Sequence, residues 1–200
     1  MIKRATDIVV SLIAIVILAG PMLLAALLIR AGSRGPAIFR QRRMGRGGRP
    51  FTMYKFRTMR ADTDPFGDSP HSPADERLTG LGRRLRQTSL DELPQLFNIL
   101  KGDMSLVGPR PLYERQAAQW DDRQRRSLLV RPGLTGYAQA YGRGALTLEE
   151  KIELDLHYVD HQSLALDCRI VWKTLGNAFS SPGQTYERRY SQQKERESDS

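Results

Sequence analysis

Two neighbouring carboxylates, Asp91 and Glu92, stand out in a chain that is otherwise strongly basic. Arginines lie shortly before the pair at 83, 84 and 86, and a Gly-Pro-Arg-Pro run follows at Gly108–Pro111. Arginine side chains bind phosphate groups well, and carboxylates beside bound phosphates need a cation such as Mg²⁺ between them. One carboxylate could also attack phosphorus and form an acyl phosphate. These residue types indicate a site for magnesium-assisted phosphoryl transfer.

A helix cap is the structural alternative for the same residues. The stretch Ser89–Glu92 matches a capping box, in which the serine and glutamate side chains bind free amides at a helix start. Acidic residues in a first turn also suit the helix dipole. However, adjacent helical residues point ~100° apart, so only one of the two acids could serve the cap well. Pro94 also stiffens the local backbone, which favours the catalytic interpretation. A helix cap remains the alternative.

The charge of the chain predicts an anionic partner. Its 200 residues carry 31 Lys and Arg against 22 Asp and Glu, a net charge of +9. The segment from Ile8 to Ala61 contains no acidic residue. Nucleic acid, a phosphorylated substrate or a membrane surface would each fit this excess. The single cysteine, Cys168, excludes an internal disulfide and a cysteine zinc cluster.

An uncharged apolar run, Ile8–Ile29, is long enough to cross a hydrocarbon core of ~30 Å. Lys3 and Arg4 precede it and arginines follow it, and positive flanks mark the cytoplasmic side of a membrane segment. One straight crossing cannot place both ends on that side, whereas a helix that bends at Gly20-Pro21 and returns can. We therefore predict a re-entrant anchor; a tilted single span and a cleavable signal peptide are the alternatives.

Periodicity predicts an α/β chain that is mainly α: an anchor over 1–30, a compact catalytic domain over 31–179 with short strands and amphipathic helices, and a disordered tail over 180–200. The expected strands form a hairpin of Ile38–Phe39 with Phe51–Phe56. The expected helices are a short one around Leu81, then Ser89–Leu100, Leu112–Leu129, Leu148–His161 and Leu164–Phe179. The last of these fits either a core helix or an interfacial helix with Trp172 at the membrane boundary, and the anchor favours the interface.

Five ordered blocks carry a resemblance to a known family. They are YKFRTM at Tyr54–Met59, SLDELPQL at Ser89–Leu96, KGDMSLVGPRP at Lys101–Pro111, RPGLTGYAQAYGR at Arg131–Arg143 and EEKIELDLHYVDHQSLALD at Glu149–Asp167. Together they resemble bacterial sugar transferases of the monotopic phosphoglycosyl transferase family, in its minimal catalytic form. The resemblance implies a re-entrant membrane helix bent at a proline, and family members often carry Ser-Pro where this chain has Gly20-Pro21.

The resemblance also implies an activity. Such enzymes transfer a sugar-1-phosphate from a UDP-sugar to undecaprenyl or another polyprenol phosphate and release UMP. They act by a ping-pong cycle through a covalent aspartyl phosphosugar, at the cytoplasmic face of the bacterial inner membrane. This is the first membrane step of surface glycan synthesis, so the expected partners are a UDP-sugar, polyprenol phosphate and the lipid bilayer.

By the same resemblance, Asp91 is the nucleophile and Glu92 holds Mg²⁺. Substrate-binding roles fall on basic residues and on prolines that shape their loop: Lys55, Arg86, Arg110, Arg143, Pro109 and Pro111. Two other classes of protein were weighed. A membrane-tethered nucleic-acid binder would leave the ordered motifs unexplained, so no nucleic acid is expected. A non-catalytic scaffold would not need the Asp-Glu pair.

Overall fold

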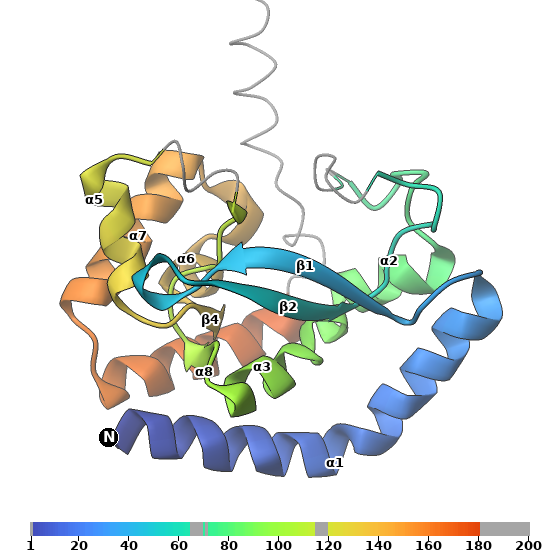
Figure 1. The fold of residues 1–200 in the computed structure, drawn as a ribbon, viewed down its shortest axis with the longest axis horizontal. Helices are drawn as coiled ribbons and strands as arrows, with labels where there is room; N and C mark the ends of the chain where they lie inside the picture. Colours follow the sequence, from blue (N-terminus) through green and yellow to red (C-terminus); the bar gives the residue numbers. More distant parts are fainter. Residues whose placement is uncertain (1, 65–69, 71, 115–119, 181–200) are drawn as a thin grey trace, which may run out of the picture.

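The computed structural model describes residues 2–64, 70, 72–114 and 120–180. Within them the chain is mainly helical, with short strands and one long apolar helix at the N-terminus (Figure 1). The helices are α1 (Ile2–Gly32), α2 (Gly80–Gln87), α3 (Gln95–Lys101), α5 (Asp122–Arg125), α6 (Tyr137–Tyr141), α7 (Leu148–Asp160) and α8 (Leu164–Ser180). The strands are β1 (Ile38–Met44), β2 (Pro50–Phe56), β3 (Ser105–Val107) and β4 (Gly133–Thr135). Short 3₁₀ helices cover Arg46–Gly48, Leu90–Glu92, Arg126–Leu129 and Arg143–Ala145.

Helix α1 is the helix in the described part that is long and apolar enough to cross a membrane. It begins before the apolar run and continues through Pro21, and it changes direction along its length (Figure 1). Its first turns are polar and attached to the rest of the protein. Lys3 donates to the carbonyl oxygen of Val107 and forms an ion pair with Asp167, while buried Asp7 accepts hydrogen bonds from Ser105.

The predicted hairpin is confirmed, although both strands are longer than expected. β1 and β2 pair antiparallel, with Ile38 opposite Phe56 and Met44 opposite Pro50. The free edge of β2 is joined to α3 by one side chain: Asn98 accepts from the Tyr54 backbone N–H at 3.0 Å and donates to the Thr52 carbonyl at 2.7 Å. The hairpin and α3 therefore form one continuous layer, in which α3 continues from the edge of β2.

Two segments for which no strand was predicted contain a second pair of strands. β3 and β4 run parallel, with Ser105 opposite Gly133. The backbones after β3 and at β4 approach so closely that a Cβ on Gly133 would lie 2.1 Å from the backbone nitrogen of Gly108. Glycine is needed at this crossing because no side chain fits between the two backbones. The contact sets the position of the loop that follows Gly108.

The predicted helices are confirmed in part. Helix α7 begins as expected, where Thr147 and Glu150 form a capping box. The helix expected over 112–129 is confirmed only at its end, where α5 and the 3₁₀ helix Arg126–Leu129 follow one another; the described residues 120 and 121 are not helical, so one continuous helix is wrong. Residues 115–119 and 181–200, where the rest of that helix and the tail were predicted, lie outside the described residues. The apolar core forms three clusters, centred on Ile99, Phe56 and Tyr158.

Candidate active site

Asp91 and Glu92 do not form a helix cap. They lie in the 3₁₀ helix between α2 and α3, and Ser89 before them has a left-handed backbone with φ of 59° and makes no side-chain capping bond. Pro94 separates this turn from α3, so the single helix predicted over Ser89–Leu100 is wrong. The capping alternative fails for a tertiary reason: the Glu92 carboxylate binds a residue from β2 instead of the local backbone.

Glu92 is held by two cations. Lys55 Nζ donates to Glu92 Oε1 at 2.7 Å, and Arg110 Nη2 lies 3.5 Å from the same oxygen. Burial by itself raises the pKa of Glu92, but the charges of Lys55 and then Arg110 outweigh burial and lower the pKa to about 2. Burial also lowers the pKa of Lys55, against the opposing effect of Glu92. Glu92 is therefore ionised at neutral pH.

Asp91 lies beside this pair in a different environment. Its side chain is buried, and no hydrogen bond to its carboxylate is found in the described part of the chain. Burial raises the pKa of Asp91 to about 6; the charge of Lys55 opposes this rise and the negative charge of Glu92 adds to it. Two adjacent acids thus titrate far apart, which is a common property of catalytic pairs.

The predicted substrate-binding arginines lie around the acids where their side chains are described. Arg86 donates to Thr58 Oγ1 at 3.2 Å, and its charge lowers the pKa of both Asp91 and Glu92. Arg110 is presented by the proline loop, as expected. The carbonyl oxygen of Pro109 accepts from the Gly133 backbone N–H at 2.9 Å, which ties this loop to β4. The side chain of Arg143, also predicted here, lies outside the described residues.

Arg43 is a residue of the site that the sequence did not single out. It is 7% exposed, donates to Gln41 Oε1 and to the Pro111 carbonyl, and stacks 3.5 Å from the centre of the Tyr113 ring. Burial lowers its pKa to about 10. Arg43 and Lys55 line the same small cavity, together with Glu92, Gln95, Arg110 and Pro111. Strand alternation could have found Arg43, but only if the strand had been predicted beyond Phe39.

Asp155 was not predicted either. This residue of α7 accepts a hydrogen bond from the backbone N–H of Arg110, and burial raises its pKa to about 7. Its buried Oδ1 atom has no hydrogen-bond partner among the described residues. Asp155 therefore supports the backbone from which Arg110 reaches Glu92. No local pattern in the α7 sequence distinguishes it from the other acids of that helix.

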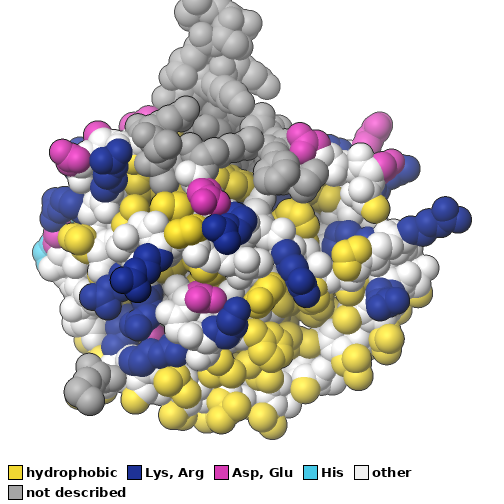
Figure 2. Space-filling view, viewed as in Figure 1, with side chains coloured by type: hydrophobic (Ala, Val, Ile, Leu, Met, Phe, Trp, Pro, Cys, Tyr) yellow, Lys and Arg dark blue, Asp and Glu magenta, His cyan; other side chains and the backbone are white. Residues whose placement is uncertain are grey.

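The acids fit Mg²⁺ only in combination with a substrate. The described residues contain no group of three or more His, Cys, Asp and Glu side chains that could hold a metal by themselves. Mg²⁺ is commonly bound through one or two carboxylates and phosphate oxygens, and ionised Glu92 with adjacent Asp91 matches that donor set. Around them the surface is basic: Figure 2 shows lysine and arginine side chains gathered over the hairpin. The arrangement suits a bound diphosphate.

The sequence of the chain matches a known protein family. The model of the bacterial sugar transferase family matches residues 1–181. An uncharacterized sugar transferase of Bacillus subtilis is 42% identical over 183 residues, covering 92% of this chain and 90% of the relative. The UDP-glucose:undecaprenyl-phosphate glucose-1-phosphate transferase of Caulobacter vibrioides is 42% identical over 191 residues, covering 90% of this chain and 70% of the relative.

A third relative shows how the chain compares with longer proteins. The UDP-N-acetylgalactosamine-undecaprenyl-phosphate N-acetylgalactosaminephosphotransferase of Aeromonas hydrophila is 42% identical over 188 residues, which cover 91% of this chain and 44% of the relative. The family match extends from the first residue past α8, so the matched range spans the segments that hold both acids, the proline loop and the N-terminal helix. The chain is a transferase that belongs to the bacterial sugar transferase family.

Proposed function

We propose that this enzyme transfers a sugar-1-phosphate from a UDP-sugar to undecaprenyl phosphate and releases UMP, through a covalent intermediate on Asp91. Two of the relatives named above, those of Aeromonas hydrophila and Caulobacter vibrioides, are named for a UDP-sugar donor and an undecaprenyl phosphate acceptor. The observation that carries the covalent step is the pairing of a buried carboxylate of raised pKa, Asp91, with an ionised neighbour, Glu92, that already has cationic partners. Asp91 is thus the acid left free to attack.

In the first step an oxygen of Asp91 attacks the phosphorus that carries the sugar. The bond between this phosphorus and the bridging oxygen breaks, and UMP leaves with that oxygen. The enzyme then carries an acyl phosphate joined to the sugar. Arg86 and Arg110, which flank the acids, stabilise the negative charge that develops on the phosphate oxygens.

In the second step a phosphate oxygen of the lipid attacks the same phosphorus. The bond from phosphorus to Asp91 breaks, the carboxylate is regenerated, and the product is a polyprenyl diphosphate sugar. Glu92, with diphosphate oxygens, would hold Mg²⁺, which supplies charge neutralisation of the donor when bound. Lys55 keeps Glu92 ionised and oriented through its 2.7 Å contact.

We further propose that α1 is re-entrant and that the catalytic domain lies on the cytoplasmic face of the inner membrane. Both ends of α1 are bound to the same domain. Lys3 is paired with Asp167 at one end, and Arg57 donates to the Ser33 carbonyl at 2.9 Å and to the Arg34 carbonyl at the other. A straight span would place these ends on opposite sides of the bilayer, where one compact domain could not hold both.

Helix α8 fits the membrane interface in this arrangement. Trp172 is 80% exposed and Leu175 is 53% exposed, whereas Ile170 of the same helix is buried. Exposed apolar side chains of this size are typical of a helix that lies in the headgroup region. The exposed face of α8 supports the bilayer as a partner. Together with the UDP-sugar and undecaprenyl phosphate, it completes the set of partners that we propose.

Intact-mass spectrometry tests the covalent step directly. The purified enzyme is mixed with Mg²⁺ and a panel of UDP-sugars in the absence of lipid acceptor. We expect a mass gain of one sugar phosphate, with stoichiometric UMP, that Asp91→Asn abolishes and added undecaprenyl phosphate removes. Release of UMP only when undecaprenyl phosphate is present, without any adduct, would contradict the intermediate and indicate direct transfer.

A further inference from the structure

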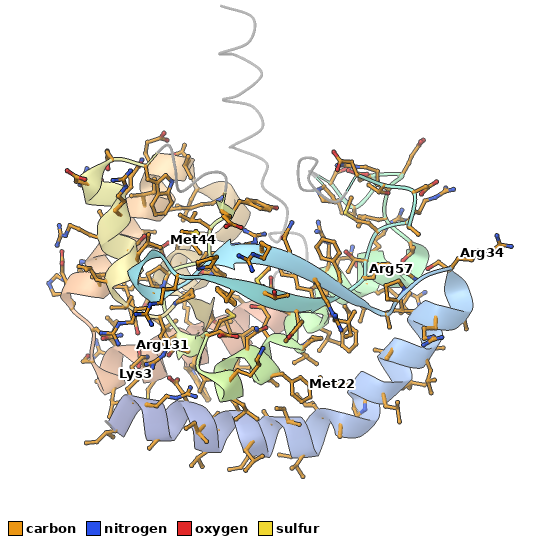
Figure 3. The ribbon with its side chains drawn as sticks, viewed as in Figure 1. Lys3, Met22, Arg34, Met44, Arg57 and Arg131 are labelled. Carbon is orange, nitrogen blue, oxygen red and sulfur yellow. The ribbon has the colours of Figure 1, made fainter. Side chains whose placement is uncertain are left out.

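A large apolar groove lies between the bent helix α1 and the hairpin. Its volume is about 570 Å³, and its lining includes Ala19 and Met22 of α1, Ile38 and Phe56 of the hairpin, and Phe97 of α3. Figure 2 shows it as a hollow in the hydrophobic surface, and Figure 3 shows Met22 on the side of α1 that faces the rest of the protein. The Phe97 side chain is 45% exposed here.

The polar end of this groove is cationic. Arg40 and Tyr54 line it and lie opposite each other in the β1–β2 pair. Lys101 Nζ donates to the Tyr54 hydroxyl at 3.3 Å, so a second cation stands beside the ring. Arg40 is exposed and has no ion-pair partner within the described chain. Two cations and a hydroxyl above an apolar groove match a phosphate headgroup above a hydrocarbon chain.

The position of the groove agrees with one membrane leaflet. From Pro21 to Gly32 α1 rises about 16 Å at the usual helical pitch, roughly half of the ~30 Å hydrocarbon core. A lipid of that leaflet would place its chain against the bend and its phosphate near Arg40. This placement rests on the re-entrant topology of the proposed function.

The hairpin separates the groove from the catalytic acids. Side chains of a strand alternate between faces, so Tyr54 and Phe56 line the groove while Lys55 lines the catalytic cavity on the other face. Asn98 joins β2 to α3 through its side-chain hydrogen bonds to the backbone of Thr52 and Tyr54. A phosphate held at Arg40 therefore lies on the opposite face of the hairpin from Asp91. The acceptor phosphate must reach Asp91, so the acceptor lipid does not fit as the occupant.

We propose that this groove binds an anionic phospholipid of the surrounding bilayer, with one acyl chain between α1 and α3 and its phosphate at Arg40 and Tyr54. The lipid fills the inner angle of the bent helix, where protein side chains leave a cavity, and it joins the membrane segment to the back of the catalytic hairpin. It is a second lipid site, distinct from the one that must deliver the acceptor phosphate to Asp91.

Photolabelling tests this site. The enzyme is reconstituted in vesicles of phosphatidylcholine with a fraction of phosphatidylglycerol that carries a photoreactive group in its acyl chain, and labelled residues are located by mass spectrometry. We expect labelling at Met22 and Phe97. Ala19→Trp, which fills the groove, should remove it, whereas Leu24→Trp, which places the same large side chain at an exposed position of α1 outside the groove, should not.

The headgroup contact has its own matched pair of variants. Arg40→Gln should lower labelling by phosphatidylglycerol about fivefold, the scale of one cation near an anionic membrane surface. Arg42→Gln should leave it unchanged, because Arg42 lies on the same strand face but outside the groove and pairs with Glu114. Equal labelling by photoreactive phosphatidylcholine and phosphatidylglycerol would overturn the anionic preference.

Two further outcomes would overturn the proposal. Labelling of groove residues that Ala19→Trp does not change would mean only general contact with bilayer lipid. Displacement of the label by undecaprenyl phosphate, at concentrations where phosphatidylglycerol does not compete, would assign the groove to the acceptor. Because Asp91→Asn should label as the unaltered enzyme does, failure of the transfer mechanism would not affect this test. Absence of any α1 label, Leu24 included, would instead contradict membrane insertion.

Discussion

At the scale of single residues, the site depends on two neighbouring acids in different surroundings. Glu92 faces Lys55 and Arg110 and stays ionised, while Asp91 is buried without a hydrogen-bond partner among the described residues and its pKa is raised. A buried carboxylate with few partners is a stronger nucleophile once ionised than one held by cations. Under the proposed mechanism, burial and the nearby charges thus separate two roles: Asp91 attacks phosphorus and Glu92 stays ionised to hold Mg²⁺.

The raised pKa of Asp91 predicts a pH dependence of the first step. Attack requires the ionised carboxylate, so the rate of adduct formation should fall as pH decreases through about 6 and level off above pH 7. Glu92 stays ionised over this range because its pKa is about 2. Rapid-quench measurement of UMP release at several pH values checks this, and a flat profile between pH 5 and 8 would contradict it.

The same shift predicts that Asp91→Asn stabilises the fold. For an acid whose pKa is raised on folding from 3.8 to about 6, stability is greatest below the unfolded value and decreases as pH rises through the folded value. Removing the charge should therefore raise the free energy of unfolding by about 1–3 kcal/mol at pH 8. Thermal unfolding should show a higher Tm at pH 8 and no difference near pH 4.

Arg43 should not tolerate replacement by lysine. Its guanidinium donates to Gln41 and to the Pro111 carbonyl and stacks on Tyr113, and a lysine cannot make this planar set of contacts. Arg43→Lys should reduce the rate of adduct formation by at least about tenfold, since a misplaced proline loop moves Arg110. Arg42→Lys, at an exposed position of the same strand, should retain the rate of the unaltered enzyme.

At the scale of elements, polar contacts hold α1 against the catalytic domain. The ammonium of Lys3 binds Asp167 and the Tyr158 hydroxyl, and Asp7 binds the start of β3. These contacts fix the first turns of an otherwise apolar helix, so its bend is positioned relative to the hairpin. The groove and the catalytic cavity on opposite hairpin faces depend on this placement.

Lys3→Met tests the attachment. It leaves the Asp167 carboxylate buried beside Tyr158 without its cation, which should cost about 3 kcal/mol of stability. Arg126→Gln removes an exposed ion pair with Asp160 and should cost less than about 1 kcal/mol. Detergent-solubilised variants compared by chemical denaturation check both values, and equal losses would show that the buried pair has no special role.

At the scale of the whole molecule, a single domain holds both ends of a helix whose middle is apolar. Exposed large hydrophobic side chains cover α1 between the two attachments. Figure 1 shows the bent helix along one side of the protein, with the hairpin and the short helices on the other. This shape suits an enzyme that takes one substrate from water and the other from the membrane.

Cysteine labelling in cells tests the topology. In a Cys168→Ser background, Ile2→Cys and Ser33→Cys should react with a membrane-impermeant reagent only after the cytoplasmic side is opened. Val16→Cys, near the bend, should resist the reagent in both conditions. Labelling of either end in intact cells, from the periplasmic side, would contradict the re-entrant arrangement and support a span.

Local patterns predicted much of this protein. The apolar helix, the hairpin and the start of α7 depend on residues that are near neighbours in the chain, so local sequence patterns were enough to predict them. The ordered motifs likewise indicated the family, which the comparisons confirm, and the catalytic pair, which stays a prediction. Ser89–Glu92 shows the limit of local patterns, because the stretch matches a capping box and yet forms no cap.

Only the tertiary structure decided which side chains meet. Glu92 binds Lys55, 37 residues earlier, in place of the adjacent amides; Arg43 joins the site through a strand longer than predicted; and Asp155 supports Arg110 from a distant helix. The pairing of β3 with β4 and the different pKa values of the two acids have the same origin. Each depends on burial and charge supplied by residues far apart in the chain, which no local spacing records.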